Sequence, residues 1–158
     1  MSFEKKAIQL GHQIPIAVQQ EGKPLKAIKI GNIVYTSGQL SINNGVDIKG
    51  KVGGELTISE GMEAAKYGTL NCVSAIKSVV GSLDNIERIV KVFGMVNVSS
   101  DFNEIPENNT SAVINGCSNL LYDIFGDAGQ HARSAVGMNL PRNYAVEIEM
   151  IVEVKNEA

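Results

Sequence analysis

Two long stretches of the chain repeat apolar residues every three or four positions, which is the spacing of an amphipathic helix. The first stretch begins after Thr57 and Glu60, a pair spaced as in a capping box, and fades near Gly81. The second follows the polar loop "SDFNEIPENN" and ends at Gly126, which is placed to stop a helix. The apolar stripes are Ile58, Met62, Ala65, Thr69, Val73, Ile76 and Val80 in the first helix and Val113, Cys117, Leu120, Leu121 and Ile124 in the second.

Other stretches alternate apolar and polar residues or concentrate β-branched ones, and these predict strands. "AIKIGNIVYTSGQL" is interrupted by the turn dipeptide Gly31-Asn32 and predicts a hairpin, whereas "ERIVKVFGMVNVSS" predicts a central strand. Near the C-terminus, "HARSAVGM" and "YAVEIEMIVEV" flank the turn "NLPRN". In the last strand one face carries Val146, Ile148, Met150, Val152 and Val154, and the other carries Glu147, Glu149 and Glu153.

The order of these elements is helix, β, β, α, β, α, β, β, beginning with a short helix in "SFEKKAIQLG". A Gly- and Asn-rich surface loop, "SINNGVDIKGKVGGEL", precedes the first long helix. This order predicts an α+β fold in which both long helices pack on one face of a mixed sheet. The opposite face would carry Arg133, Glu147 and Glu149 beside apolar residues such as Ile151. A half-apolar open face of this kind is expected at a contact between subunits.

Composition and charge narrow the classes of function. The length suits one domain over residues 1–158, with an N-terminal extension that includes the short helix (1–25) and a core (26–155). The net charge of −3 gives no basic face for nucleic acid, and no apolar run reaches the roughly 18 residues of a membrane span. The charged start lacks the apolar segment of a secretory signal, so we expect a cytoplasmic protein in which Cys72 and Cys117 are buried free thiols. Two His and two Cys far apart assemble no metal site.

Arg133 is the residue of "HARSAVGM" that does not suit a plain strand. If the last two strands form a hairpin centred near Leu140, Arg133 and Glu147 face one another on the sheet face away from the helices. Ala135 and Gly137 add almost no bulk beside the guanidinium, whose planar fork of donors can bind a carboxylate with two parallel hydrogen bonds. The pattern fits either a site for a small carboxylate or a plain cross-strand ion pair, and spacing alone favours the ion pair.

Two segments of the chain, "GNIVYTSGQL" and "ARSAVGMNLPRNYAVEIEMIVEV", resemble the signature regions of the YjgF/RidA family, whose members are also named L-PSP endoribonuclease-like proteins. The segment "VINGCSNLLYDIFGDAGQHARSAVG" resembles more narrowly a RidA-like subgroup with an N-terminal extension and a "GxHARSAVG" block. The similarity extends from about Ile28 to Val154 and preserves the order of elements. It implies a chorismate-mutase-like fold, a homotrimer with a barrel-like centre, and ligand clefts between subunits.

The resemblance also implies an activity and a set of residues. The best-known members hydrolyse reactive enamine or imine intermediates of 2-imino acids to 2-oxo acids and ammonia, a reaction that requires no metal or organic cofactor. Arg133 matches the arginine that binds the substrate carboxylate, and Glu147 matches the glutamate that positions the hydrolytic water. Ser37 and Gly38 of "TSGQ" match residues that line the same cleft, and Asn115 matches an asparagine before the core of the second long helix.

The chain departs from the family archetype at two positions of the cleft. Ala135, which we include among the substrate-binding residues, stands where the archetype has a cysteine, two positions after the arginine. Lys23 and Pro24 occupy the stretch where the archetype has a tyrosine upstream of the Gly-Asn turn. Both changes alter the wall of the cleft and its polarity.

Three classes of function follow from these observations. The first is a trimeric enzyme that hydrolyses 2-imino acids, and the second is a trimer that binds a small carboxylate or 2-oxo acid through Arg133 without turnover. The third, ribonuclease activity, follows from the older family name, and the acidic composition ranks it last.

Among other residues, His131 fits a loop or capping role better than that of a general base. Ser37 fits a hydrogen-bonding role better than that of a nucleophile, because no His–Asp partner is evident.

Overall fold

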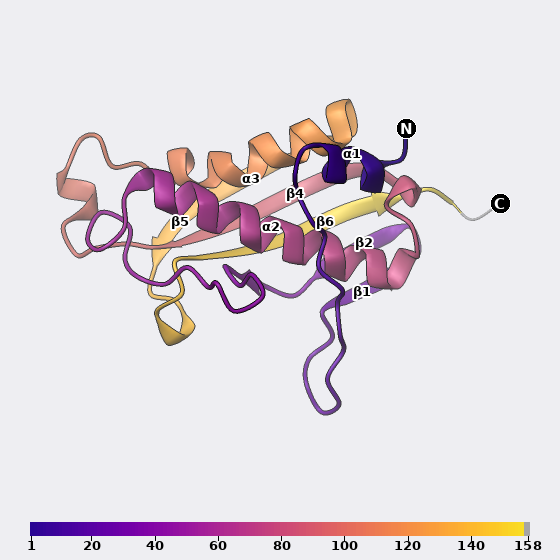
Figure 1. Cartoon of the computed structure of the whole chain (residues 1–158), viewed down its shortest axis with the longest axis horizontal. Helices are drawn as coiled ribbons and strands as arrows, with labels where there is room; N and C mark the ends of the chain where they lie inside the picture. The colour runs from indigo at the N-terminus through magenta and orange to yellow at the C-terminus, as the bar shows by residue number, and fades with distance from the viewer. Residues whose placement is uncertain (157–158) are drawn as a thin grey trace.

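The computed structural model describes residues 1–156 and shows one mixed β-sheet covered by helices (Figure 1). The strands along the chain are β1 (Ala27–Ile30), β2 (Ile33–Thr36), β3 (Gln39–Leu40), β4 (Ile86–Asn97), β5 (Ala132–Met138) and β6 (Val146–Val154). They lie in the order β1-β2-β6-β4-β5, and the short strand β3 also pairs with β6. Within the described sheet β4 and β5 run parallel, and the other pairs are antiparallel. This sheet confirms the predicted α+β class and the central place of β4.

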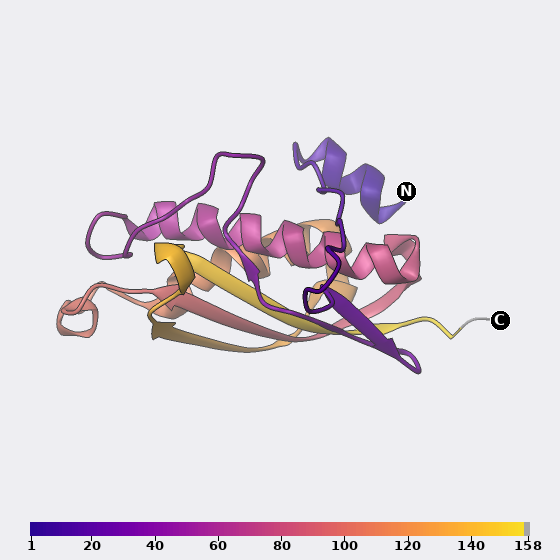
Figure 2. The ribbon, with the colours of Figure 1, turned by 90° about the horizontal axis from the view of Figure 1, so that it is seen from below.

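The helices form a second layer. They are α1 (Phe3–Gln9), α2 (Ile58–Val80) and α3 (Thr110–Phe125). α2 and α3 lie side by side against one face of the sheet, and the other face is left open (Figure 2). α1 lies on the outer side of this layer, where the ring of Phe3 meets that of Phe125 edge to face. The two-layer arrangement and the buried free thiols of Cys72 and Cys117 agree with the predictions, and no described helix has the length and hydropathy of a membrane span.

The boundaries of α2 follow from its terminal residues. The Thr57 hydroxyl accepts a hydrogen bond from the Glu60 amide at 3.1 Å, and the Glu60 carboxylate accepts one from the Thr57 amide at 2.7 Å. This reciprocal pair satisfies two amides at the start of the helix. At the other end Gly81 adopts a φ of +80°, which a residue with a Cβ rarely adopts. Both boundaries therefore confirm the sequence prediction.

α2 and α3 are in close backbone contact at Gly116. A Cβ at this position would overlap with the main-chain carbonyl of Met62 on α2. We expect Gly116→Ala to lower the free energy of unfolding by about 2–3 kcal/mol, because neither backbone can withdraw without opening the core. Urea unfolding measures the loss, with the exposed Asn119→Ala on the same helix as the control. Equal stability of Gly116→Ala and the wild-type chain would contradict this tight contact.

β1 and β2 form the predicted hairpin. Ile30 pairs with Ile33 across Gly31-Asn32, and Gly31 has the positive φ (+60°) that such a tight turn requires. The Asn32 side-chain amide donates to a Glu153 carboxylate oxygen on β6 at 3.1 Å. This contact fixes the hairpin beside β6, directly before the "SGQ" segment.

The pairing of the last two strands differs from the predicted hairpin. β4 lies between β5 and β6, so that Arg133 pairs with Val92, while Glu147 pairs with Met95. α3 makes the crossover between the parallel strands β4 and β5, and the chain then passes the end of β4 before it returns as β6. A central strand between β5 and β6 leaves their apolar alternation unchanged, so spacing along the chain did not distinguish the two arrangements.

The register also decides which face each side chain occupies, because directly paired strand residues point to the same face. The row of Arg133, Val92 and Met150 faces the helices, where Val92 and Met150 are buried. Glu147 and Met95 belong to a row on the open face. The prediction that Arg133 shares the open face with Glu147 is therefore wrong. Side chains on the open face include Tyr35, Lys91, Phe93, Met95, Ser134, Val136, Glu147, Glu149 and Ile151.

Candidate functional site

β5 is the edge strand of the sheet, and helix α3 covers this edge (Figure 1). The side chain of Arg133 on β5 contacts this helix. Its Nη1 donates to the Asn115 side-chain oxygen at 2.9 Å and to the Ser118 hydroxyl at 3.1 Å, and its Nη2 donates to the Ser111 carbonyl at 3.4 Å. These contacts use three of the five guanidinium N–H donors and leave one on Nε and one on Nη2. Arg133 is half-buried, so a carboxylate can approach this remaining pair of donors.

A second layer of hydrogen bonds lies behind Arg133. The Ser118 hydroxyl is 2.9 Å from His131 Nε2, and His131 Nδ1 is 2.6 Å from the Gly129 carbonyl. A carbonyl oxygen only accepts, so Nδ1 carries the proton and Nε2 accepts from Ser118. Burial, and to a lesser degree the charge of Arg133, lower the pKa of His131, while its bond to Gly129 opposes this shift. Burial and the Arg133 charge therefore favour the neutral imidazole, to which Ser118 donates its proton while its lone pair accepts from Arg133.

A shallow cavity of about 300 Å³ opens beside this network. Its lining residues are Ser118, Tyr122, Gln130, His131 and Arg133. The guanidinium, a hydroxyl and an aromatic ring thus surround one small space, which suits a short organic acid better than a polymer.

Glu147 lies in a different environment, on the open face of β6. Its carboxylate is packed so closely on Gly38 that a Cβ there would overlap with a Glu147 carboxylate oxygen. Burial, followed by repulsion from Glu149, raises the pKa of Glu147 above that of an ordinary glutamate. A half-buried carboxyl of this kind exchanges a proton nearer to neutral pH, which suits general acid–base chemistry.

Ser37 is next to Gly38 in the chain, and its hydroxyl donates to the Leu25 carbonyl at 2.6 Å. The Ser37 amide also donates to the Lys26 carbonyl at 2.8 Å. Both bonds fix the loop that carries Gly38. They agree with the prediction that Ser37 is a hydrogen-bonding residue.

The predicted site residues form two groups within one chain. Arg133, Asn115 and Ala135 lie at the β5 edge under α3, and the Ala135 carbonyl accepts from Thr110 on that helix at 3.1 Å. The other group comprises Ser37, Gly38 and Glu147, on and beside the open face. No ion pair among the described residues joins Arg133 to Glu147, and the expected opposition across a hairpin is absent because β4 separates them.

Sequence reasoning missed the contribution of Ser118 and gave His131 no direct link to Arg133. One signal was available, since Asn115 and Ser118 are three residues apart and therefore share a helix face. The bond between Ser118 and His131 depends on how the turn after α3 folds back on that helix. Spacing along the chain does not reveal such a contact.

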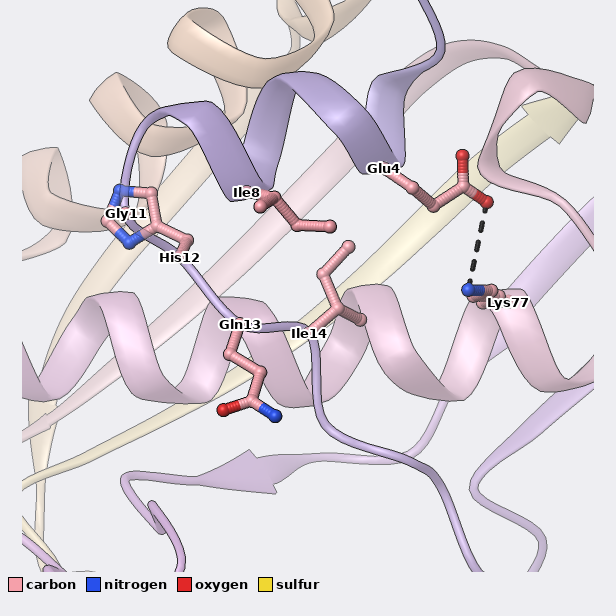
Figure 3. Close-up of a pocket in the computed structure, with 7 residues that line it drawn as sticks. All are labelled: Glu4, Ile8, Gly11, His12, Gln13, Ile14 and Lys77. Atoms are coloured by element: carbon pink, nitrogen blue, oxygen red, sulfur yellow. Dashed lines mark ion pairs between the residues drawn. The ribbon is translucent and has the colours of Figure 1, made fainter.

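A separate cavity of about 420 Å³ lies between α1, the segment that follows it, and α2 (Figure 3). Glu4 and Lys77 form an ion pair at its edge, with a carboxylate-to-ammonium distance of 3.8 Å. The residues that line it are Glu4, Ile8, Gly11, His12, Gln13, Ile14 and Lys77. None of the predicted site residues borders this space, so we assign the candidate chemistry to the Arg133 and Glu147 groups.

The chain resembles known proteins over most of its length. A family model described as "YjgF/chorismate mutase-like, putative endoribonuclease" matches residues 4–153. Protein TCP17 of Trypanosoma cruzi is 37% identical over 150 residues, which cover 93% of this chain and 91% of TCP17. The crystal structure of Atu1372 from Agrobacterium tumefaciens, a protein of unknown function, has a TM-score of 0.87 at 34% identity and covers 98% of this chain and 94% of that one. The crystal structure of E. coli TdcF with bound serine has a TM-score of 0.57 at 22% identity, covering 89% and 93% of the two chains, and it shows the common fold.

These matches agree with the sequence signatures and with the two-layer fold. The family model spans nearly the whole chain, including both groups of candidate residues. The protein therefore belongs to the YjgF/RidA family.

Proposed function

We propose that this protein hydrolyses reactive 2-imino acids and their enamines to 2-oxo acids and ammonia, in a cleft between two copies of the chain. The observation that carries the proposal is the environment of Arg133, whose contacts with α3 leave N–H donors on two adjacent nitrogens at a half-buried edge. A guanidinium arranged in this way favours a small carboxylate. The proposed enzyme is cytoplasmic and works without a metal or organic cofactor.

The separation of the two groups within one chain supports a site that two copies share. The open face carries Glu147 beside partly exposed apolar side chains such as Phe93, Val136 and Ile151, a composition that favours contact with a second copy. If the β5 edge of one copy meets the open face of the next, Arg133 of one subunit approaches Glu147 of another. A closed ring of three such contacts gives the homotrimer that the family resemblance implies.

In the proposed reaction, Arg133 binds the carboxylate of the imine and thereby orients its C=N bond. Glu147 accepts a proton from water as the water oxygen bonds to the imine carbon, and the proton passes to the nitrogen. The resulting carbinolamine transfers its hydroxyl proton to nitrogen, and the C–N bond breaks to release ammonia and the 2-oxo acid. The raised pKa of Glu147 suits both acceptance and return of a proton.

The experiment that tests the proposal follows 2-oxo acid formation from imines generated in situ by an amino-acid oxidase. The purified protein is expected to accelerate hydrolysis of a short-chain 2-imino acid over buffer and over an equal mass of an inert protein. Absence of acceleration with imines from several amino acids would contradict the proposed reaction.

A second candidate is binding of a 2-oxo acid or another small carboxylate without turnover. Ala135 favours it, because this residue places a methyl group, and no proton donor, two positions from Arg133 on the same strand face. The bound serine in the TdcF crystal structure supports a small carboxylate as the ligand class. Thermal stabilisation by 2-oxo acids, together with no acceleration of imine hydrolysis, would favour this candidate.

RNA cleavage that disappears with Arg133→Ala would instead support the endoribonuclease activity in the family description.

A further inference from the structure

Three hydrogen bonds in sequence connect a buried turn to the guanidinium of Arg133. The Gly129 carbonyl binds His131 Nδ1, His131 Nε2 binds the Ser118 hydroxyl, and this hydroxyl binds Arg133 Nη1 at 3.1 Å. The turn is fixed because Gly129 is buried against the Leu121 carbonyl of α3, where a Cβ would overlap. The series of contacts therefore begins at a buried, closely packed point of the backbone.

Each bond in this chain sets the direction of the next. The Gly129 carbonyl fixes the proton on His131 Nδ1, so that Nε2 is an acceptor. The single hydroxyl proton of Ser118 then points at His131, and a lone pair remains for Arg133. Without His131, the Ser118 hydroxyl loses the acceptor that fixes its direction, so its lone pair is no longer held toward Arg133.

We propose that His131 and Ser118 are positioning residues that hold Arg133 in the orientation that binds the substrate carboxylate. This inference rests on the proposed function, since it assigns the carboxylate to Arg133. By engaging Nη1, the relay of His131 and Ser118 leaves the donors on Nε and Nη2 for the ligand. It acts through Arg133 and touches no reacting atom.

The first test requires no ligand. The rate at which p-hydroxyphenylglyoxal modifies Arg133, followed by mass spectrometry of its peptide, reports how firmly the guanidinium is held. Ser118→Ala and His131→Phe are expected to raise this rate about three- to tenfold, as the loss of one or two hydrogen bonds implies. Ser118→Thr retains a hydroxyl and should restore the slow rate. Asn119→Ala changes the adjacent exposed residue and should leave the rate unchanged.

Unchanged Arg133 modification in folded Ser118→Ala and His131→Phe would overturn the relay, whatever the protein's activity. If Ser118→Ala fails to fold, the rate of Arg133 modification in His131→Phe tests the relay by itself. Nitrogen-15 NMR of His131 in the wild-type protein gives an independent reading. A proton on Nδ1 with a bare Nε2 near neutral pH is expected, and the opposite tautomer would also overturn the relay.

The second test separates binding from turnover. In the imine assay, Ser118→Ala and His131→Phe should raise KM about three- to tenfold with a smaller change in kcat, because carboxylate binding is what they weaken. The Kd of 2-oxobutanoate should rise in parallel, and Ser118→Thr should recover both values. A fall in kcat at constant KM and Kd would overturn the positioning role. A wild-type protein that binds 2-oxobutanoate but turns over no imine would refute only the proposed reaction.

Discussion

Arg133→Ala is expected to reduce kcat/KM for 2-imino acids by roughly 100-fold, which corresponds to about 3 kcal/mol for a lost charge-assisted pair of hydrogen bonds. The loss should appear in KM and in the Kd of 2-oxo acids, because the guanidinium binds the carboxylate in both substrate and product. Stability should change little by comparison, since Arg133 is half-buried at an edge strand and its partners Asn115 and Ser111 are exposed.

Steady-state kinetics and calorimetric titration with 2-oxobutanoate measure this loss. Arg133→Lys is the matched variant, because it retains the positive charge but loses the planar fork of donors. It should bind better than Arg133→Ala and remain at least about tenfold weaker than the wild type. Wild-type affinity in Arg133→Ala would place the carboxylate elsewhere and refute the assignment of this site.

Glu147→Gln is expected to lower kcat about 100- to 10,000-fold, the usual contribution of a general acid or base, while the Kd of 2-oxo acids stays close to the wild-type value. The amide preserves the size of the side chain, so its packing on Gly38 is retained. Glu149→Gln, a change at an exposed residue on the same face, is the control and should retain most of the activity.

The pH profile should report the same residue. Burial and Glu149 raise the pKa of Glu147, so the ionised base is lost at a higher pH than for an ordinary glutamate. Activity is therefore expected to fall as the pH decreases through this raised pKa, and Glu149→Gln should move the acidic limb to lower pH. An acidic limb that is unchanged in Glu149→Gln would contradict the assigned origin of the limb.

The elements that the sequence predicted correctly depend on local signals. The capping pair at Thr57 and Glu60 defines the start of α2, and Gly31-Asn32 defines the first hairpin, because each acts within a few residues. The predicted pairing of β5 with β6 was wrong, because the strand that lies next to another in a sheet is not determined by local sequence. Apolar alternation assigns residues to faces of a strand, but it does not identify the neighbouring strand.

The same difference between local and non-local signals applies to the candidate site. The residue pattern singled out Arg133 and Glu147, family resemblance added Asn115, and the structure places Asn115 in direct contact with Arg133. The error was to place Arg133 opposite Glu147 within one chain, which the insertion of β4 prevents. The contact between Ser118 and His131 depends on the turn at the end of α3, and neither residue carries a sequence signal for it.

Mixed oligomers test whether one cleft combines Arg133 of one subunit with Glu147 of another. Arg133→Ala and Glu147→Gln chains with different tags are co-expressed, and mixed trimers are isolated and verified by native mass spectrometry. Each mixed trimer, with two chains of one variant and one of the other, restores one cleft of its three, because each cleft draws its two residues from neighbouring chains. Activity near a third of wild type is therefore expected from two inactive parents. Verified mixed trimers with no more activity than either parent would contradict it.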